Sequence, residues 1–445
     1  MNRQACRLDL LDFCCTFPQP FLGKSAPGEC LGLGKSQFSA FLQADLSPER
    51  YDAIGVPSLG DGPNQCSMKF VAHQCSISIK KPGRTGKTGS IFSAPQGTFH
   101  SMSTEQIVKK QLDSNMWRMS VAPMMDWTDK HCRYFHRLLS QHTLLYTEMV
   151  TTGALVHGDV ARHLRFEAEE HPVALQLGGS EPADLAHSAR LGEQWGYDEI
   201  NLNCGCPSER VQRGAFGACL MNEAALVADC VKAMADVVSV PVTVKHRIGI
   251  DKIESYDFVR DFVGTVADAG CQVFVVHARN AWLKGLSPKE NREIPPLRYE
   301  VVAQLKRDFP GLTIAVNGGI KTDDIVQQQL QQVDGVMVGR EAYHNPWWMA
   351  SWDALYYQDE SRERTREQIE EQMVLYMERE AREHGTHWYS IARHMLGLRN
   401  GLAGARRWRQ VWSDHRLKTL PAHEVMKLAR TKPNEIQPEP AEQML

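Results

Sequence analysis

The sequence lacks the marks of several protein classes. Lys and Arg (50) nearly cancel Asp and Glu (53), and the formal charge of −3 excludes a uniformly basic, histone-like nucleic-acid binder. The 12 cysteines form no CxxC…CxxC pair, so we expect free thiols in a reducing cytosol and neither a disulfide scaffold nor a metal site. Apolar stretches such as residues 8–22 are interrupted by acidic residues and proline, so we expect no membrane span, no targeting peptide and a cytoplasmic location.

The composition divides the chain unevenly. Residues 1–115 show no sustained helical or strand period and are rich in Gly, Pro and Ser, so we assign them no fold and expect a disordered extension. We expect a catalytic domain over residues 116–350 and a small helical domain over residues 351–430. The polar, Pro-rich residues 431–445 are predicted to be a disordered tail.

Short apolar or β-branched runs alternate with amphipathic segments in the second part of the chain. The runs are residues 120–124, 144–148, 173–177, 199–203, 241–245, 273–277, 313–317 and 335–339. Helices are predicted between them over residues 181–195, 222–237, 256–269, 299–309 and 322–330. Eight such units in about 220 residues, with strands apolar on both faces, predict a (β/α)8 TIM barrel. A doubly wound open sheet is the alternative.

Polar or reactive residues end nearly every predicted strand. They are Pro123-Met124, Glu148, Gln176, residues 203–206, Lys245, residues 277–279, residues 317–319 and Gly339-Arg340. One such residue is an ordinary capped strand end, but barrels place their catalytic groups at this rim, and so many converging there predict a functional site.

The chemistry of the predicted rim points to a phosphorylated flavin. Residues 317–319 and Gly339-Arg340 offer backbone N–H groups and a guanidinium where barrels commonly bind phosphate. A buried Lys245 requires a negative partner, which a reduced flavin ring would supply. Gln176 suits a pyrimidine-like ring edge, and His277 can donate to a phosphate or ring oxygen. The chain contains no GxGxxG, so we favour FMN over a dinucleotide held by a Rossmann turn.

Cys206 is the most informative thiol, because Gly205-Cys206-Pro207 is a tight turn after the fourth predicted strand. It is a buried structural cysteine, a nucleophile or a proton donor. No His or Asp follows the turn locally to hold a thiolate, so we favour the proton donor. We interpret the other cysteines of this region as structural; they are Cys132, Cys204, Cys219, Cys230 and Cys271.

Several of these segments resemble the tRNA-dihydrouridine synthases. They are residues 122–129, 201–208, 214–221, 244–249, 277–285 and 316–320, and the resemblance runs from about residue 119 to residue 409. Residues 286–296 are similar to the A branch, which acts on uridines 20 and 20a of the tRNA D-loop. The sequence departs from the family in its N-terminal extension and in Cys204, where another small residue is usual.

The resemblance implies that NADPH reduces FMN, that the flavin passes a hydride to C6 of a uracil, and that Cys206 protonates C5. NADPH would share the substrate cavity, and we expect a monomer. The implied FMN-binding residues are Pro123, Met124, Met125, Gln176, Lys245, His277, Asn317, Gly318, Gly319, Gly339 and Arg340. Asn203 would face the target base, and the implied tRNA contacts are Lys289, Arg292, Arg406 and Arg409.

A basic segment near the C-terminus suits an RNA ligand. Residues 385–420 hold seven Lys and Arg residues and one acidic residue, in a chain that is acidic overall. Four aromatic residues interleave with them, namely Trp388, Tyr389, Trp408 and Trp412. They form either a base-stacking surface or an ordinary helix-packing face, and the spacing leaves both open.

Two other functions explain part of the pattern. An FMN barrel oxidoreductase acting on a small molecule, similar to dihydroorotate dehydrogenase, would account for the rim and leave the basic helical domain without a role. A non-catalytic RNA chaperone would account for the basic segment, and it predicts RNA binding that does not depend on flavin.

Overall fold

The computed structural model describes residues 69–71, 74–76, 115–360 and 364–431. The chain forms two compact units, Met1–Thr98 and Phe99–Leu445. In the first unit, β1 (Lys69–Val71) and β2 (Gln74–Ser76) pair antiparallel, with Phe70 opposite Cys75. These three-residue strands are too short to leave a period in the sequence, and we had predicted no strand there. The disorder predicted elsewhere in residues 1–115 and in the tail lies outside the described residues, and the domain boundaries stay predictions.

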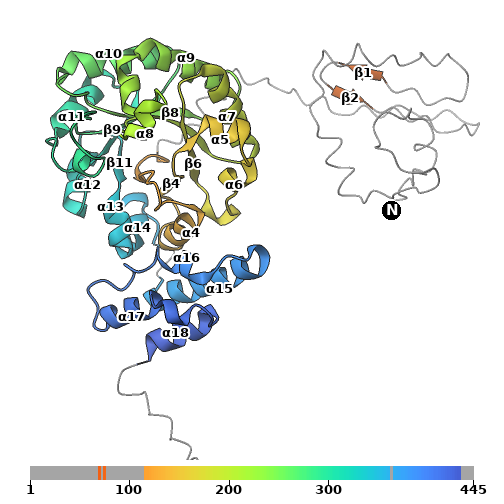
Figure 1. Ribbon diagram of the computed structural model, residues 1–445. Helices are drawn as coiled ribbons and strands as arrows, with labels where there is room; N and C mark the ends of the chain where they lie inside the picture. The colour runs from red at the N-terminus through yellow and green to blue at the C-terminus, as the bar shows by residue number, and fades with distance from the viewer. Residues whose placement is uncertain (1–68, 72–73, 77–114, 361–363, 432–445) are drawn as a thin grey trace, which may run out of the picture. The chain divides into compact units, whose positions relative to one another are not determined.

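The second unit contains a closed parallel barrel (Figure 1). Its strands are β3 (Met119–Val121), β4 (Leu144–Tyr146), β6 (Val173–Gly178), β7 (Glu199–Cys204), β8 (Val242–Arg247), β9 (Val273–His277), β10 (Thr313–Asn317) and β11 (Gly335–Val338). β11 pairs with β3 and β4 pairs with β6, which closes the ring of eight. The (β/α)8 prediction is therefore confirmed, and the open-sheet alternative is wrong.

The second predicted strand is interrupted. β4 ends at Tyr146, and a two-residue strand, β5 (Val150–Thr151), pairs with the last residues of β6. In the gap, the backbone N–H of Gln176 donates to the Thr147 hydroxyl at 3.0 Å instead of to a carbonyl of the neighbouring strand. A side-chain hydroxyl thus replaces one backbone acceptor of the strand ladder.

Helices surround the barrel. They are α4 (Lys130–Leu139), α5 (Thr152–His157), α6 (Val160–Leu164), α7 (Pro182–Gln194), α8 (Glu209–Arg213), α9 (Ala224–Ala235), α10 (Tyr256–Asp268), α11 (Tyr299–Asp308), α12 (Asp323–Leu330), α13 (Arg340–His344) and α14 (Trp352–Tyr357), with 3-10 turns η2 (Ala168–Glu170), η3 (Gly217–Asn222), η4 (Glu290–Arg292) and η5 (Pro346–Ser351). All five predicted helices form within two residues of their expected ends. The strands read as apolar on both faces because one core lies between strands and helices and a second fills the barrel interior, around Trp117, Tyr146 and Met337.

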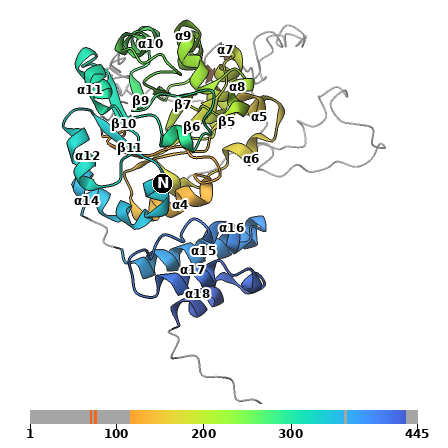
Figure 2. The same cartoon turned by 60° about the vertical axis from the view of Figure 1, so that its left-hand side comes forward.

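The helical domain predicted after the barrel is present. It contains α15 (Arg366–His384), α16 (Trp388–Ala392), α17 (Ala405–Trp412), η6 (His415–Leu417) and α18 (Ala422–Arg430) (Figure 2). α15 begins with a capping box between Thr365 and Gln368 and ends at Gly385, whose φ of 66° suits glycine. None of the helices in the described ranges is long and apolar enough to cross a membrane.

Ion pairs join this domain to the barrel. Lys130 on α4 pairs with Glu380 on α15 at 2.7 Å. Asp129 caps the N-terminus of α4 and also binds Arg393 at 2.6 Å and His394 at 3.0 Å. One carboxylate thus starts a barrel helix and anchors the helical domain beside it.

The interleaved tryptophans pack inside the helical domain. Trp388, Trp408 and Trp412 are all buried. Tyr389 is half-buried, with the Lys418 ammonium 4.3 Å from its ring centroid. The helix-packing interpretation is therefore correct for the tryptophans, and the base-stacking alternative is wrong for them.

Candidate active site at the barrel rim

Parallel pairing brings the predicted site residues to one end of the barrel. Asn203 on β7 is opposite Lys245 on β8, and His277 on β9 is opposite Asn317 on β10. The Lys245 ammonium donates to Asn317 Oδ1 at 3.2 Å. Asn203 Nδ2 donates to Gln176 Oε1 at 2.8 Å. These five residues, predicted from strand ends alone, therefore form one cluster at the mouth.

The cluster is electrostatically unbalanced toward positive charge. Burial, and then repulsion from Arg247, lower the pKa of Lys245 to about 7. Burial, and then Arg247 and Lys245, hold the pKa of His277 well below its ordinary value, so its ring is neutral at pH 7. The hydrogen-bond partner of Lys245 is a neutral amide, so an anionic ligand would be stabilised here and would return the lysine to its charged form.

The turn after β10 needs its two glycines. Gly318 and Gly319 have φ of 112° and 70°, a region that L side chains rarely adopt. A Cβ on Gly318 would lie 2.7 Å from the ring of His277, and one on Gly319 would lie 2.4 Å from Leu297. The glycines thus let the backbone approach the mouth closely, as a phosphate-binding turn requires.

Residues 205–207, here called the Cys206 loop, are fixed by hydrogen bonds from β7, β8 and the following segment. The backbone N–H groups of Gly205 and Cys206 donate to Asn203 Oδ1 at 3.1 and 3.0 Å. Arg247 Nε donates to the Gly205 carbonyl at 3.1 Å. The Cys206 carbonyl accepts from Ala218 N at 2.9 Å. The half-buried thiol is therefore presented on a fixed turn beside Lys245 and Asn203.

Cations act on this thiol. Lys245, Arg247 and Arg292 all interact electrostatically with Cys206. Burial is the largest effect on each of the other described cysteines and raises its pKa; they are Cys132, Cys204, Cys219, Cys230 and Cys271. Cys132, Cys204, Cys230 and Cys271 are buried, whereas Cys219 is half-buried.

Arg247 is a site residue that the sequence analysis missed. Its buried guanidinium donates to the carbonyls of Gly205, Asn280 and Asn291, so it joins the Cys206 loop to the segment after β9. Burial lowers its pKa to about 10. The signal was available: Arg247 lies two positions after Lys245 in β8, and alternate residues of a strand share a face.

The remaining predicted cofactor residues lie at the closure of the ring. Pro123 and Met124 follow β3 and are half-buried, while Met125 is 56% exposed. Gly339 follows β11, with Ala122 beside it. Arg340 begins α13 and forms an ion pair with Glu293 at 2.5 Å. Its guanidinium is therefore shared with a neighbouring loop, and a phosphate would compete with Glu293 for it.

The four predicted RNA contacts fall into two places. Lys289 and Arg292 are exposed at η4, in the segment that Arg247 joins to the Cys206 loop. Arg406 and Arg409 lie on α17 of the helical domain. Arg406 is exposed, and Arg409 donates to Asn400 at 2.6 Å.

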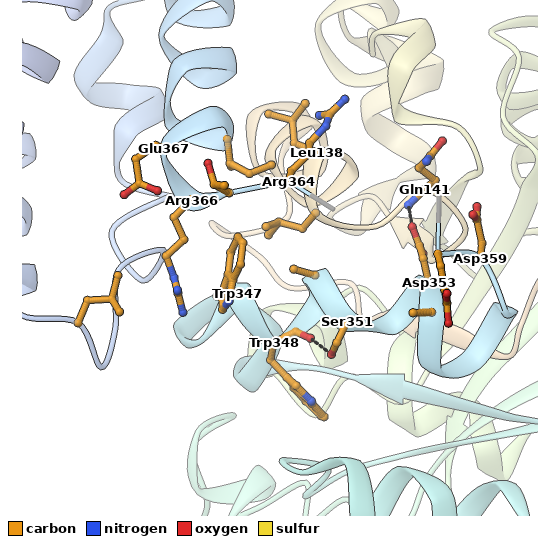
Figure 3. Close-up of a pocket in the computed structure, with 17 residues that line it drawn as sticks. Leu138, Gln141, Trp347, Trp348, Ser351, Asp353, Asp359, Arg364, Arg366 and Glu367 are labelled. Atoms are coloured by element: carbon orange, nitrogen blue, oxygen red, sulfur yellow. Dashed lines mark hydrogen bonds between the residues drawn. The ribbon is translucent and has the colours of Figure 1, made fainter. Parts of the chain in front are cut away.

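A cavity of about 980 Å³ lies elsewhere, between the barrel and the start of α15 (Figure 3). Trp347, Trp348, Asp353 and Arg366 are among the residues that line it. It contains none of the predicted rim residues. The rim therefore remains the candidate active site.

The fold and the rim together define the class: a (β/α)8-barrel enzyme with a cysteine and a lysine at its mouth and a helical domain appended. The family model for dihydrouridine synthase (Dus) matches residues 120–432. A tRNA-dihydrouridine(20/20a) synthase from Vibrio cholerae is 58% identical over 316 residues, which cover 71% of this chain and 96% of that protein. Proteins of the same name from Escherichia coli K12 and Pseudomonas putida are 60% and 61% identical, over 67% and 66% of this chain and 86% and 88% of their own lengths.

The chain belongs to the dihydrouridine synthase family and is an oxidoreductase. The resemblance inferred from the sequence motifs is confirmed. The family match begins at residue 120, which is the second residue of β3.

Proposed function

We propose that this protein reduces uridine to 5,6-dihydrouridine at positions 20 and 20a of the tRNA D-loop, with FMN as its cofactor and NADPH as the reductant. The observation that carries the proposal is the presentation of Cys206 on a turn held by Asn203, among Lys245, Arg247 and Arg292. The names of the relatives support the substrate and its positions.

The residues at the mouth fit FMN. Lys245 is a half-buried cation whose hydrogen-bond partner, Asn317, is neutral, and the glycine turn at Gly318 and Gly319 directly follows that partner. The residues that would hold the cofactor are Pro123, Met124, Met125, Gln176, Lys245, His277, Asn317, Gly318, Gly319, Gly339 and Arg340. FMN, when bound, supplies a hydride to C6 of the uracil ring. The thiol of Cys206 supplies the proton that C5 then requires.

Asn203 would orient the base by donating a hydrogen bond. Its Oδ1 already accepts from two backbone N–H groups, and its Nδ2 uses one hydrogen on Gln176. A primary amide has two such hydrogens, so one N–H remains for a carbonyl oxygen of the base.

The tRNA would be held by both basic regions. A uridine must leave its stack to enter the mouth, and phosphate contacts offset that cost. Lys289 and Arg292 border the Cys206 side, while Arg406 and Arg409 would bind the tRNA from the helical domain. NADPH would use the same mouth before the tRNA. We propose that the protein acts as a monomer in the cytoplasm.

The test is Cys206→Ala, with Cys219→Ala as a matched control at another half-buried thiol. Cys206→Ala should keep bound flavin and tRNA affinity and lose nearly all dihydrouridine formation, measured by mass spectrometry of the tRNA, because the proton donor is gone. Cys219→Ala should behave as the wild type. Normal turnover by Cys206→Ala would remove this cysteine as the acid. Wild-type turnover of a free uracil or small enone, with none on tRNA, would favour the small-molecule oxidoreductase.

A further inference from the structure

A continuous series of buried side-chain hydrogen bonds crosses the barrel interior and ends at the Cys206 loop. It starts at Glu199, the first residue of β7, which is fully buried. Glu199 Oε2 accepts from Trp117 Nε1 at 2.5 Å. Its Oε1 accepts from the hydroxyls of Tyr146 at 2.6 Å and Thr243 at 2.5 Å. These partners are neutral donors, so the carboxylate is satisfied as an acceptor only.

The series continues to the rim through side chains of three neighbouring strands, β8, β7 and β6. Asn201 Nδ2 donates to Thr243 Oγ1 at 2.7 Å, and Gln176 Nε2 donates to Asn201 Oδ1 at 2.8 Å. Asn203 Nδ2 then donates to Gln176 Oε1 at 2.8 Å. The strand register explains the geometry, since Asn201 is paired with Gln176 on one side and with Thr243 on the other. Glu199, Asn201 and Asn203 alternate along β7 and share its inner face.

Every hydrogen bond of the series has a defined donor and acceptor, and the groups at its two ends require the same arrangement. A primary amide can exchange its oxygen and nitrogen by turning over with little change of shape, so its partners must decide which atom faces where. At one end the carboxylate requires Thr243 to donate, and its hydroxyl oxygen then accepts from Asn201. At the other end the N–H groups of Gly205 and Cys206 require the oxygen of Asn203. Each amide between them has one orientation that satisfies both neighbours.

We propose that Glu199 is a positioning residue: through Thr243 and Asn201 it holds Gln176 toward the cofactor and Asn203, with the Cys206 loop, toward the base. This inference rests on the proposed function and deepens it. Glu199 lies at the opposite end of β7 from Asn203. It would therefore act through the series of side-chain hydrogen bonds and contact neither the cofactor nor the base. Gln176 and Asn203 each keep one amide N–H that could donate to the cofactor and to the base, because the other polar groups of each amide are already hydrogen-bonded.

The test is a pair of variants at the link next to Glu199. Thr243→Val keeps the shape of the side chain but removes the hydroxyl, whereas Thr243→Ser keeps the hydroxyl. Two rates are measured on the full-length, flavin-bound protein: flavin reduction by NADPH, and dihydrouridine formation in a single turnover at saturating tRNA. Loss of alignment should slow the uridine step in Thr243→Val by about 10²-fold and leave flavin reduction within about threefold, and Thr243→Ser should recover most of the loss.

Glu199→Gln is the second variant. It preserves volume but places an N–H opposite donors, so it should show the same selective loss. Uridine reduction at the wild-type rate in both Thr243→Val and Glu199→Gln would refute the proposal. So would equal losses in the Val and Ser variants together with lost flavin or a lowered melting temperature, because that pattern marks a purely structural role.

A test of the positioning role of Glu199 can be separated from a test of the proposed function. If the wild-type protein formed no dihydrouridine in tRNA, the proposed function would fail. The alkylation rate of Cys206 by iodoacetamide in the flavin-bound protein would still test whether the series of side-chain hydrogen bonds positions the Cys206 loop. Thr243→Val should change that rate and Thr243→Ser should not; equal rates in all three proteins would refute the positioning role.

Discussion

Glu370 holds the helical domain together by satisfying four donors. Its Oε1 accepts from the indole N–H groups of Trp408 and Trp412 at 2.6 and 2.9 Å. Its Oε2 accepts from Arg399 at 3.0 Å and Arg430 at 2.9 Å. The carboxylate is fully buried on α15, and its partners come from α17, α18 and the segment before α17. We therefore predict that Glu370→Gln destabilises this domain selectively.

The magnitude follows from the geometry. A glutamine has one oxygen, so either the indoles or the two guanidinium groups must face its NH₂ group. Breaking a buried ion pair by removing one partner costs about 3–5 kcal/mol. The side chains of Arg399 and Arg430 are 17% and 28% exposed, so water recovers part of that loss and the lower end of the range is expected.

The assay is urea unfolding followed by near-ultraviolet circular dichroism, which reports the packed tryptophans. tRNA affinity should fall in the same variant because α17 carries two of the proposed tRNA contacts, Arg406 and Arg409, while the proposed flavin reduction by NADPH in the barrel should persist. Glu371→Gln is the matched control: Glu371 pairs with Arg430 at 2.8 Å but is half exposed, so its loss should cost no more than about 1 kcal/mol. An unchanged unfolding midpoint in Glu370→Gln would refute the reasoning.

Three further predictions concern the RNA contacts, the lysine and the extension. Arg406→Ala combined with Arg409→Ala should weaken tRNA binding and flatten its dependence on salt while flavin reduction by NADPH persists; an unchanged salt slope would place the RNA contacts elsewhere. Burial lowers the pKa of Lys245 from 10.5 to about 7, so between these values the folded protein binds fewer protons than the unfolded chain and loses stability as the pH falls. Lys245→Met should remove up to about 1.4 kcal/mol per pH unit of that slope in flavin-free protein, measured by urea unfolding from pH 9 to pH 7; equal slopes in the two proteins would contradict the shift. Deletion of residues 1–115 should leave dihydrouridine formation intact, because the family match begins at residue 120, and insoluble or flavin-free product would show that the extension is needed to fold the barrel.

The barrel could be predicted because its strands are buried on both faces, which makes them continuous apolar runs rather than alternating ones. The rim followed from chain direction alone, since parallel strands all end on one side. The break after Tyr146 could not be predicted, because it depends on Thr147 meeting the backbone of Gln176 on the next strand. Local sequence does not encode which neighbour a hydroxyl finds.

The other differences between the predictions and the structure arise from contacts between residues that are far apart in the sequence. Helical spacing allowed Trp408 and Trp412 to face either RNA or a core, and Glu370, which binds both indoles, lies 38 and 42 positions away. Arg340 was predicted from its place after β11, but its ion pair with Glu293 comes from a loop 47 positions earlier. In both cases the residue type indicated a kind of interaction, but the sequence did not indicate which distant residue would be the partner.

The fully buried Glu199 and the half-buried Lys245 bear on why the mouth of the barrel should attract an anion. Glu199 begins β7 and Lys245 is paired with Asn203, four residues further along that strand. At about 3.3 Å per residue they are roughly 13 Å apart. Burial raises the pKa of Glu199. Even when it is fully ionised, its attraction to Lys245 at an effective dielectric constant near 20 is about 1.3 kcal/mol. A lysine pKa lowered from 10.5 to about 7 corresponds to a penalty of more than 4 kcal/mol, on the scale of about 1.4 kcal/mol per unit. Glu199 therefore offsets only a small part of the cost of charging Lys245, and an anion bound at the mouth would stabilise the charged lysine.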